Sequence, residues 1–175
     1  MRVLNIHGYQ GSFDNSAYIA LQSIGCDIIS PQLDYDSEDP EQIIEKLTDL
    51  ARKNKTNVIV GTSFGGFFAA MVSADLHLPL ILVNPCLMPF LHLPRLGYKG
   101  DIQPYIKLFS KILLIDPENV SCIVGDSDEV IDTHDFAERL FGNSRFRKIL
   151  GGKHSGSTLP LKEFFNVIVL HNKDD

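Results

Sequence analysis

The hydrophobic positions of this chain fall into short β-rich runs, separated by longer segments in which hydrophobic residues recur at helical spacing. The runs predicted to be strands are residues 2–6, 26–30, 57–60, 80–83, 120–124 and 146–149. Helices are predicted near residues 15–23, 41–53, 104–112, 132–141 and 159–171, with a further helix beginning after Ser63. Strands that alternate with helices are typical of βαβ units. The pattern therefore predicts an α/β fold, with a mostly parallel sheet of about six strands and helices on both faces.

Residues 84–118 interrupt this rhythm. Pro85, Pro89 and Pro94 lie among bulky apolar residues, and this spacing of prolines disfavours a long regular helix. We expect the segment to be an irregular excursion that forms at most a small lid. Since no repeat or linker composition marks a boundary, residues 1–175 are predicted to form a single domain.

Composition and charge narrow the classes of partner. The formal net charge is −6, which provides no basic field for nucleic acid, so we expect small molecules rather than nucleic acids as partners. No apolar run approaches the roughly 18 residues of a membrane span. The N-terminus leads directly into a strand-like run rather than a secretory signal, so we expect a cytoplasmic protein. The sequence does not indicate an oligomeric state.

The cysteines do not suggest a disulfide framework or a metal site. Cys26, Cys86 and Cys122 are far apart in the chain, and none has a second cysteine or a histidine at the spacing of metal ligands. The sequence therefore predicts no metal site. No organic cofactor is predicted either.

The strongest candidate for chemistry is a Gly-Thr-Ser-Phe-Gly run at residues 61–65, which fits G-x-S-x-G. A strand-like run precedes it and a helix-like run follows. In that context the serine lies on a sharp strand-to-helix turn that projects its hydroxyl above the sheet. The alternative is an ordinary βα turn with Ser63 as a helix N-cap. A phosphate loop is disfavoured because the run lacks the lysine and spacing of a Walker motif. We therefore predict that Ser63 is a nucleophile.

A serine nucleophile needs a base that takes its proton, and in the G-x-S-x-G fold the histidine comes last in the chain. His154 lies in a glycine-rich loop directly after the last predicted strand. Open α/β sheets place their sites at such carboxyl ends of strands. We predict His154 as the base. His134, by contrast, falls near the start of a predicted helix and is assigned no role.

The acid that orients the base is expected after the strand at residues 120–124. The candidates by position are Asp126, Asp128, Glu129 and Asp132. Asp128 is the preferred candidate and Asp126 the next, while Asp132 is better placed to cap the following helix.

Two further expectations concern the surroundings of Ser63. The backbone N–H groups of Phe64 and Tyr9 are predicted to form an oxyanion hole, one from the residue after the nucleophile and one from the loop after the first strand. The apolar residues expected to line a substrate pocket are Phe13, Phe64, Met88, Phe90 and Leu91.

With these motifs placed, the chain resembles the YqiA-like small bacterial esterases of the α/β-hydrolase superfamily. The likeness rests on residues 4–9, 31–33, 61–69, 83–85, 125–132 and 151–154. It implies a compact α/β-hydrolase fold without the superfamily's usual N-terminal strand pair. It also implies ester or thioester hydrolysis by Ser63, Asp128 and His154. Two departures concern substrate specificity: Ser155 follows His154 where an aromatic is common, and the segment after Pro85 is shortened.

The sequence as a whole predicts a serine hydrolase that cleaves carboxylic esters or thioesters through an acyl-enzyme. An acyltransferase or a peptidase could use the same three residues. A non-catalytic binding protein could use the same fold, because a fold does not fix a function.

Overall fold

The fold was analysed in a computed structural model, which describes residues 1–131, 133–142 and 145–171. Its centre is a six-stranded sheet in the order β2-β1-β3-β4-β5-β6, and every neighbouring pair is parallel. The strands are β1 Arg2–Ile6, β2 Asp27–Ile29, β3 Val58–Thr62, β4 Leu80–Val83, β5 Val120–Gly125 and β6 Phe146–Ile149. The predicted α/β fold with a parallel sheet is therefore confirmed.

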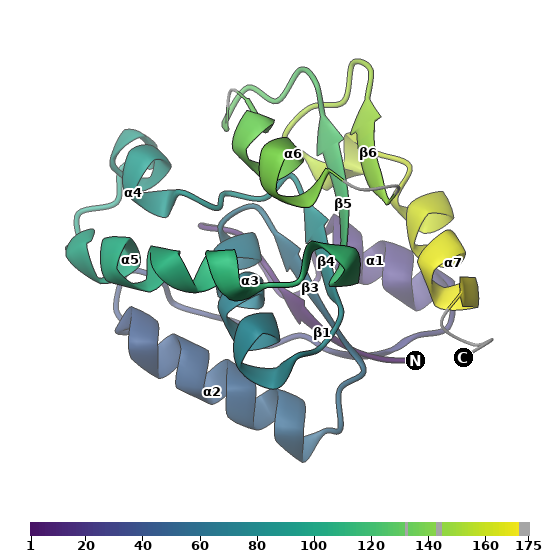
Figure 1. Cartoon of the computed structure of the whole chain (residues 1–175), viewed down its shortest axis with the longest axis horizontal. Helices are drawn as coiled ribbons and strands as arrows, with labels where there is room; N and C mark the ends of the chain where they lie inside the picture. Colours follow the sequence, from purple (N-terminus) through teal and green to yellow (C-terminus); the bar gives the residue numbers. More distant parts are fainter. Residues whose placement is uncertain (132, 143–144, 172–175) are drawn as a thin grey trace.

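Helices cover both faces of this sheet (Figure 1). The helices are α1 Ser16–Ser23, α2 Pro40–Lys53, α3 Phe64–Leu76, α4 Pro89–His92, α5 Gln103–Leu108, α6 Asp135–Phe141 and α7 Leu161–His171. Helices α1 and α7 pack on one face, while α2, α3 and α6 pack on the other. Alternate strand residues point to opposite sides of the sheet. Because consecutive residues of the central strands are apolar, both faces are apolar. In β1, for example, Val3 joins one core cluster and Leu4 joins the other.

Local sequence explains where several helices begin and end. Helix α2 starts at Pro40, one residue before the predicted start, and the Asp39 carboxylate caps it by accepting from the Glu41 and Gln42 N–H groups. Helix α1 is capped by Asn15, whose side chain accepts from the Tyr18 N–H. Helix α3 is buried along most of its length, which accounts for its composition of small and aromatic residues.

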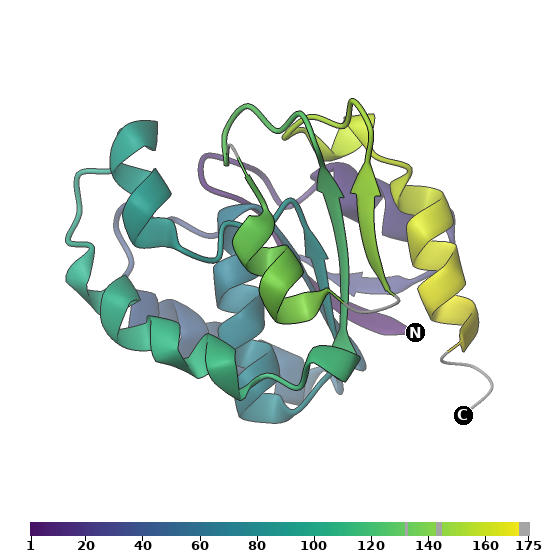
Figure 2. The same ribbon diagram turned by 45° about the horizontal axis from the view of Figure 1, so that its top comes forward.

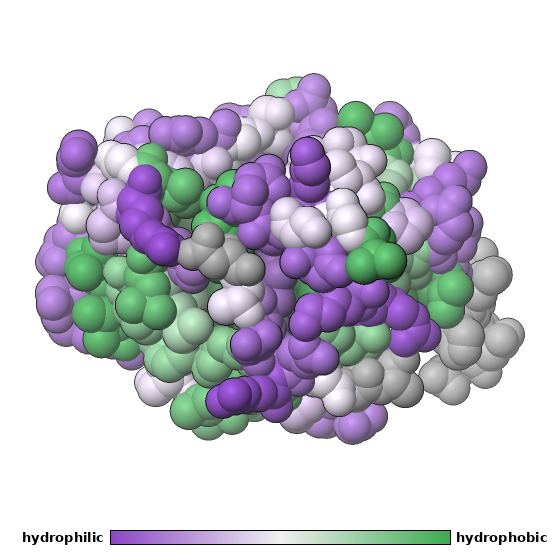
Figure 3. Space-filling view, turned by 90° about the horizontal axis from the view of Figure 1, so that it is seen from above, coloured by the Kyte–Doolittle hydropathy of each residue, from purple (hydrophilic) through white to green (hydrophobic). Residues whose placement is uncertain are grey.

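The excursion between β4 and β5 consists of short helical pieces, as its prolines predict. Helix α4 continues into a 3₁₀ helix at Leu93–Leu96, and α5 continues into another at Phe109–Leu114. Figure 2 shows that this segment extends to one side of the sheet. Leu91 and Ile106 are exposed on it. In Figure 3, hydrophobic residues gather on the side where α4 and α5 lie.

The described part of the chain contains no helix that is both long and apolar enough to cross a membrane.

Candidate active site

Ser63 occupies a strained position between β3 and α3. Its backbone angles are φ 53° and ψ −123°, a region that non-glycine residues rarely adopt. Hydrogen bonds on both sides hold it there: the Ser63 N–H donates to the Val83 carbonyl, and the Cys86 N–H donates to the Ser63 carbonyl, each at 2.9 Å. A nucleophile elbow requires a strained strand-to-helix turn of this kind, which presents the hydroxyl at the end of the sheet.

Two glycines make this turn sterically feasible. A Cβ on Gly65 would overlap the carbonyl oxygens of Ile6 and His7, so only glycine allows α3 to approach β1 so closely. A Cβ on Gly8 would lie 2.9 Å from the Ser63 Cβ, so the loop after β1 runs directly against the serine.

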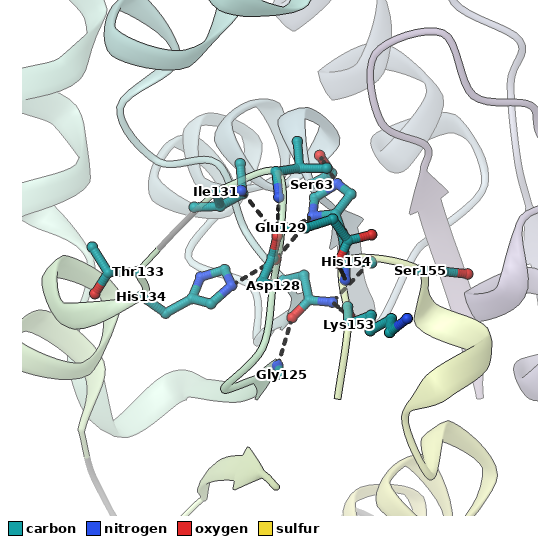
Figure 4. A network of polar contacts seen from close by, with 12 residues as sticks. Ser63, Gly125, Asp128, Glu129, Ile131, Thr133, His134, Lys153, His154 and Ser155 are labelled. Atoms are coloured by element: carbon teal, nitrogen blue, oxygen red, sulfur yellow. Dashed lines mark hydrogen bonds and ion pairs between the residues drawn. The ribbon is translucent and has the colours of Figure 1, made fainter. Parts of the chain in front are cut away.

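His154 lies between Ser63 and Asp128 (Figure 4). Its Nε2 is 2.9 Å from Ser63 Oγ, and its Nδ1 is 2.9 Å and 3.0 Å from Asp128 Oδ2 and Oδ1. A carboxylate can only accept, so Nδ1 carries the proton and Nε2 keeps a lone pair for the serine hydroxyl. This tautomer is the one that a general base requires.

Asp128 is buried and surrounded by donors. The Val130 and Ile131 N–H groups donate to Oδ1 at 2.8 Å and 2.9 Å, and His134 Nε2 lies 2.9 Å from Oδ2. Burial by itself opposes ionisation. The hydrogen bonds from His134, His154 and the two backbone N–H groups outweigh it and hold the pKa of Asp128 well below its usual range. The carboxylate is therefore charged at any pH at which a histidine acts as a base.

The loop that carries His154 is anchored by Asn84, which directly follows β4. The Asn84 Nδ2 donates to the Lys153 and His154 carbonyls at 2.8 Å and 2.9 Å, and the Gly125 N–H donates to Asn84 Oδ1 at 2.8 Å. Asn84 is fully buried and has a φ of 43°, in the left-handed region that asparagine tolerates better than most residues. One side chain thus ties together the ends of β4 and β5 and the β6–α7 loop.

A second tether reaches the same loop from the segment after β5. The His154 N–H donates to Glu129 Oε2 at 3.2 Å. Glu129, one of the candidate acids, therefore contacts the backbone of His154, whereas Asp128 contacts its ring.

The loop after β1 is positioned by His7. Its Nε2 accepts from the Leu33 N–H at 3.0 Å, which leaves Nδ1 to donate to the Gly8 carbonyl at 2.8 Å, and the Tyr35 hydroxyl donates to the His7 carbonyl at 2.5 Å. Burial lowers the pKa of His7, although the Gly8 contact opposes that shift. A neutral His7 thus holds the loop beside Ser63 that contains Tyr9.

The sheet topology explains why these loops meet. From β1 the chain moves outward to β2 and then returns to β3 on the other side of β1. Ligand sites of open α/β sheets lie at such a switch point, outside the carboxyl ends of the strands. The Gly8 loop and Ser63 follow the two strands at this point, while Asp128 and His154 follow β5 and β6.

Other predicted site residues have different surroundings. Asp126 Oδ1 accepts from the Gly151 N–H at 2.7 Å and so joins the ends of β5 and β6, while Asp132 lies outside the described residues.

The expectation that the Phe64 ring lines an open pocket is wrong. The ring is 1% exposed and packs against Tyr35, Phe67, Phe68 and Tyr105, because α3 is a core helix. The backbone N–H of Phe64, the first in α3, has no intrahelical acceptor.

The four other predicted pocket residues lie in two segments, the loop after β1 and the start of the excursion around α4. Phe13 is half exposed and contacts Tyr18, while Phe90 contacts Phe109. Leu91 is exposed, and Met88 borders a small cavity beside His134. Their grouping around a substrate stays a prediction.

Sequence reasoning missed the roles of Asn84 and His134. Asn84 carried one usable signal, because a lone polar residue directly after a fully apolar strand lies at the edge where sites form. His134 is separated from Asp128 by six positions that do not belong to one helix, and no spacing rule identifies it.

Comparisons with known proteins agree with this architecture. A protein of the α/β-hydrolase superfamily from Xanthomonas campestris pv. campestris shares 17% identity, with 97% of this chain and 98% of that chain covered and a TM-score of 0.67. Est1E from Butyrivibrio proteoclasticus shares 19% identity over 97% of this chain and 88% of its own, also with a TM-score of 0.67. A monoacylglycerol lipase from Paleococcus ferrophilus shares 11% identity over 97% and 92%, with a TM-score of 0.66.

The fold is therefore that of the α/β-hydrolase superfamily. The model of an uncharacterised protein family, UPF0227, matches residues 2–154, and the chain belongs to that family.

Proposed function

We propose that this protein is a serine hydrolase that cleaves carboxylic esters or thioesters of small molecules through an acyl-enzyme. The observation that carries the proposal is the continuous hydrogen-bonded chain from Ser63 Oγ through the His154 ring to the Asp128 carboxylate. It coincides with the strained backbone of Ser63. An ordinary βα turn with an N-cap serine requires neither feature, and the Ser63 side chain caps no N–H of α3.

The first step acylates the serine. His154 Nε2 takes the hydroxyl proton as Ser63 Oγ attacks the carbonyl carbon of the substrate. Asp128 keeps Nδ1 protonated and stabilises the imidazolium that forms. The N–H groups of Phe64 and Tyr9 are assigned to the developing oxyanion, because one begins α3 and the other lies in the loop that contacts Ser63. The alcohol or thiol then leaves with the proton held by His154.

The second step releases the acid. His154 takes a proton from water, the hydroxide attacks the acyl carbon, and the Ser63 oxygen recovers the proton from His154. Both steps use the same three side chains and the same backbone N–H groups. Est1E and the monoacylglycerol lipase have the same fold as this chain. The name of the lipase describes a protein of this fold that hydrolyses esters, which supports the proposal.

Hydrolysis of a nitrophenyl ester series, from acetyl to a long acyl chain, tests this proposal. The wild-type protein should turn over at least part of the series, and Ser63→Ala should lower kcat/KM at least about a thousandfold. Thioesters of matched acyl length complete the series. No turnover of any ester or thioester by the folded protein, or turnover that survives Ser63→Ala, would contradict the proposal.

A further inference from the structure

Asp128 has a second imidazole partner besides His154. His134, the N-cap residue of α6, places its Nε2 2.9 Å from Asp128 Oδ2, and the two side chains are 2% and 1% exposed. Figure 4 shows the His134 and His154 rings approaching the carboxylate from opposite sides. One buried carboxylate is thus shared by two histidines.

The direction of this hydrogen bond follows from the chemistry of the acceptor. An ionised carboxylate has no proton to give, so Nε2 of His134 carries the proton and donates it. The other ring nitrogen, Nδ1, is buried and has no hydrogen-bond partner within the described residues. His134 borders a cavity of about 20 Å³ that is also lined by Pro85, His92 and Thr133. A cavity of that size holds no more than one water molecule.

Packing alone does not account for a histidine at this position. A polar ring nitrogen buried without a protein partner is unfavourable, and an apolar side chain would fill the same space without that penalty. An imidazole provides an N–H group that donates to Asp128 Oδ2, and an apolar side chain does not. The hydrogen bond to Asp128 is therefore the feature that explains a histidine at this position.

The other donors to Asp128 show what that bond changes. The N–H groups of Val130 and Ile131 hold Oδ1, and His134 holds Oδ2. Together they fix the rotation of the carboxylate so that it faces His154 Nδ1. His134 also draws part of the negative charge toward itself, which weakens the attraction of Asp128 for the Nδ1 proton of His154.

We infer that His134 is a positioning residue for the reaction of Ser63, His154 and Asp128. It orients the Asp128 carboxylate and sets the pH range in which His154 can act as a base. The inference rests on the proposed function and adds to it a residue that touches neither substrate nor serine.

The other ionisable groups around this pair come from three segments. Cys86, after β4, faces Asp128 as a neutral thiol, because burial and then the nearby carboxylate raise its pKa to about 12. Glu129 contacts the His154 backbone, and His92 of α4 lines the same small cavity as His134. Asp135, next in the chain, is exposed. A substitution at position 134 changes none of these groups, so its effect reports the bond to Asp128.

Three variants separate positioning from simple destabilisation. His134→Leu removes the donor. His134→Gln retains an amide N–H near the place of Nε2. Phe141→Leu trims a buried side chain at the far end of the same helix, away from Asp128. The pH dependence of kcat/KM on a nitrophenyl ester is measured for each variant, beside the wild-type protein and Ser63→Ala.

We expect His134→Leu to lower kcat/KM at pH 7 roughly tenfold, since a hydrogen bond to a buried charge is lost. It should also move the midpoint of the acid limb upward by about half to one pH unit, since Asp128 then holds the proton of His154 more tightly. His134→Gln should stay near the wild-type rate and midpoint. Phe141→Leu should lower thermal stability without moving the midpoint.

Equal midpoints for His134→Leu and the wild-type protein, with Ser63 still required, would overturn this inference and leave the proposed function intact. Full activity of Ser63→Ala would instead overturn the proposed function. If His134→Leu does not fold, nitrogen-15 NMR of the wild-type histidines decides the question. The inference requires His134 to hold its proton on Nε2 throughout the acid limb, and a proton on Nδ1 alone would refute it.

Discussion

At the scale of single residues, the site depends on a few atoms whose positions the backbone dictates. Ser63 is held at φ 53° by hydrogen bonds of its N–H and its carbonyl to Val83 and Cys86, so its hydroxyl direction is set before any substrate binds. The Asp128 carboxylate accepts from two backbone N–H groups of its own loop and from two histidines. Such preorganisation removes the need to reorient dipoles during the reaction.

The choice of Asp128 over Asp126 is tested by a matched pair of substitutions. Asp128→Asn allows the wrong His154 tautomer, because an amide N–H can face Nδ1, and kcat should fall by about a thousandfold or more. Asp126→Asn keeps an oxygen that can accept from the Gly151 N–H, so kcat should change by only a few fold. Steady-state kinetics on one ester compares them, and equal losses would contradict the assignment.

At the scale of elements, the site is assembled by loops that follow β1, β3, β4, β5 and β6. Asn84 is the clearest link among them, since its amide reaches residues 69 and 70 positions away and also the end of β5. A loop whose backbone is hydrogen-bonded to a buried side chain at Lys153 and His154 moves less than a free one, which keeps the His154 ring near Ser63.

Removing this link should lower both stability and turnover. Asn84→Ala loses three hydrogen bonds at a buried site and leaves alanine at a positive φ, so unfolding should become easier by about 2–4 kcal/mol. Turnover should fall with it, because the His154 loop loses its anchor. Asn54→Ala removes one hydrogen bond, to the Leu50 carbonyl, at the end of α2 and should leave kcat/KM unchanged. Urea unfolding and ester kinetics measure both, and an unchanged kcat/KM in Asn84→Ala would contradict the anchoring role.

The elements themselves could be predicted from the sequence, while the contacts between them could not. The strands at Leu80–Val83 and Phe146–Ile149 match their predicted bounds. The first is an apolar run between two prolines and the second is followed by a pair of glycines, and both are local signals. Ser63 carried a motif, and the glycine-rich loop marked His154. Asp126, Asp128 and Glu129 differ by only a few positions, so the conformation of the loop, which periodicity does not encode, decides which of them faces the imidazole.

At the scale of the whole molecule, the order of the strands brings the site together. The direction in which the chain adds strands to the sheet reverses between β1 and β3, and the loops that follow these two strands meet there. His7 ties this region to the segment after β2 through the Leu33 N–H. The prediction of a nucleophile at residues 61–65 therefore needed only the local motif, whereas the role of His7 depends on the topology.

The buried His7 makes global stability depend on pH. Its pKa is lowered in the folded state, so the unfolded chain binds the proton more tightly and acid favours unfolding. The stabilisation is present above the unfolded pKa of about 6.5 and is lost as the pH falls through the lower folded pKa. His7→Gln, whose carbonyl can accept from Leu33, should flatten this part of the curve. The exposed His77→Gln should not. Urea unfolding between pH 7.5 and pH 5 measures the difference, and parallel curves would refute it.

The most direct test of the central claim is covalent labelling with a fluorophosphonate, followed by intact-mass spectrometry and peptide mapping. The account predicts one adduct per chain, located on Ser63, because only a hydroxyl activated by His154 attacks the probe at neutral pH. Ser63→Ala should show no adduct, and His154→Ala should label far more slowly. A full adduct on Ser63→Ala, or an adduct mapped to another residue, would contradict the account.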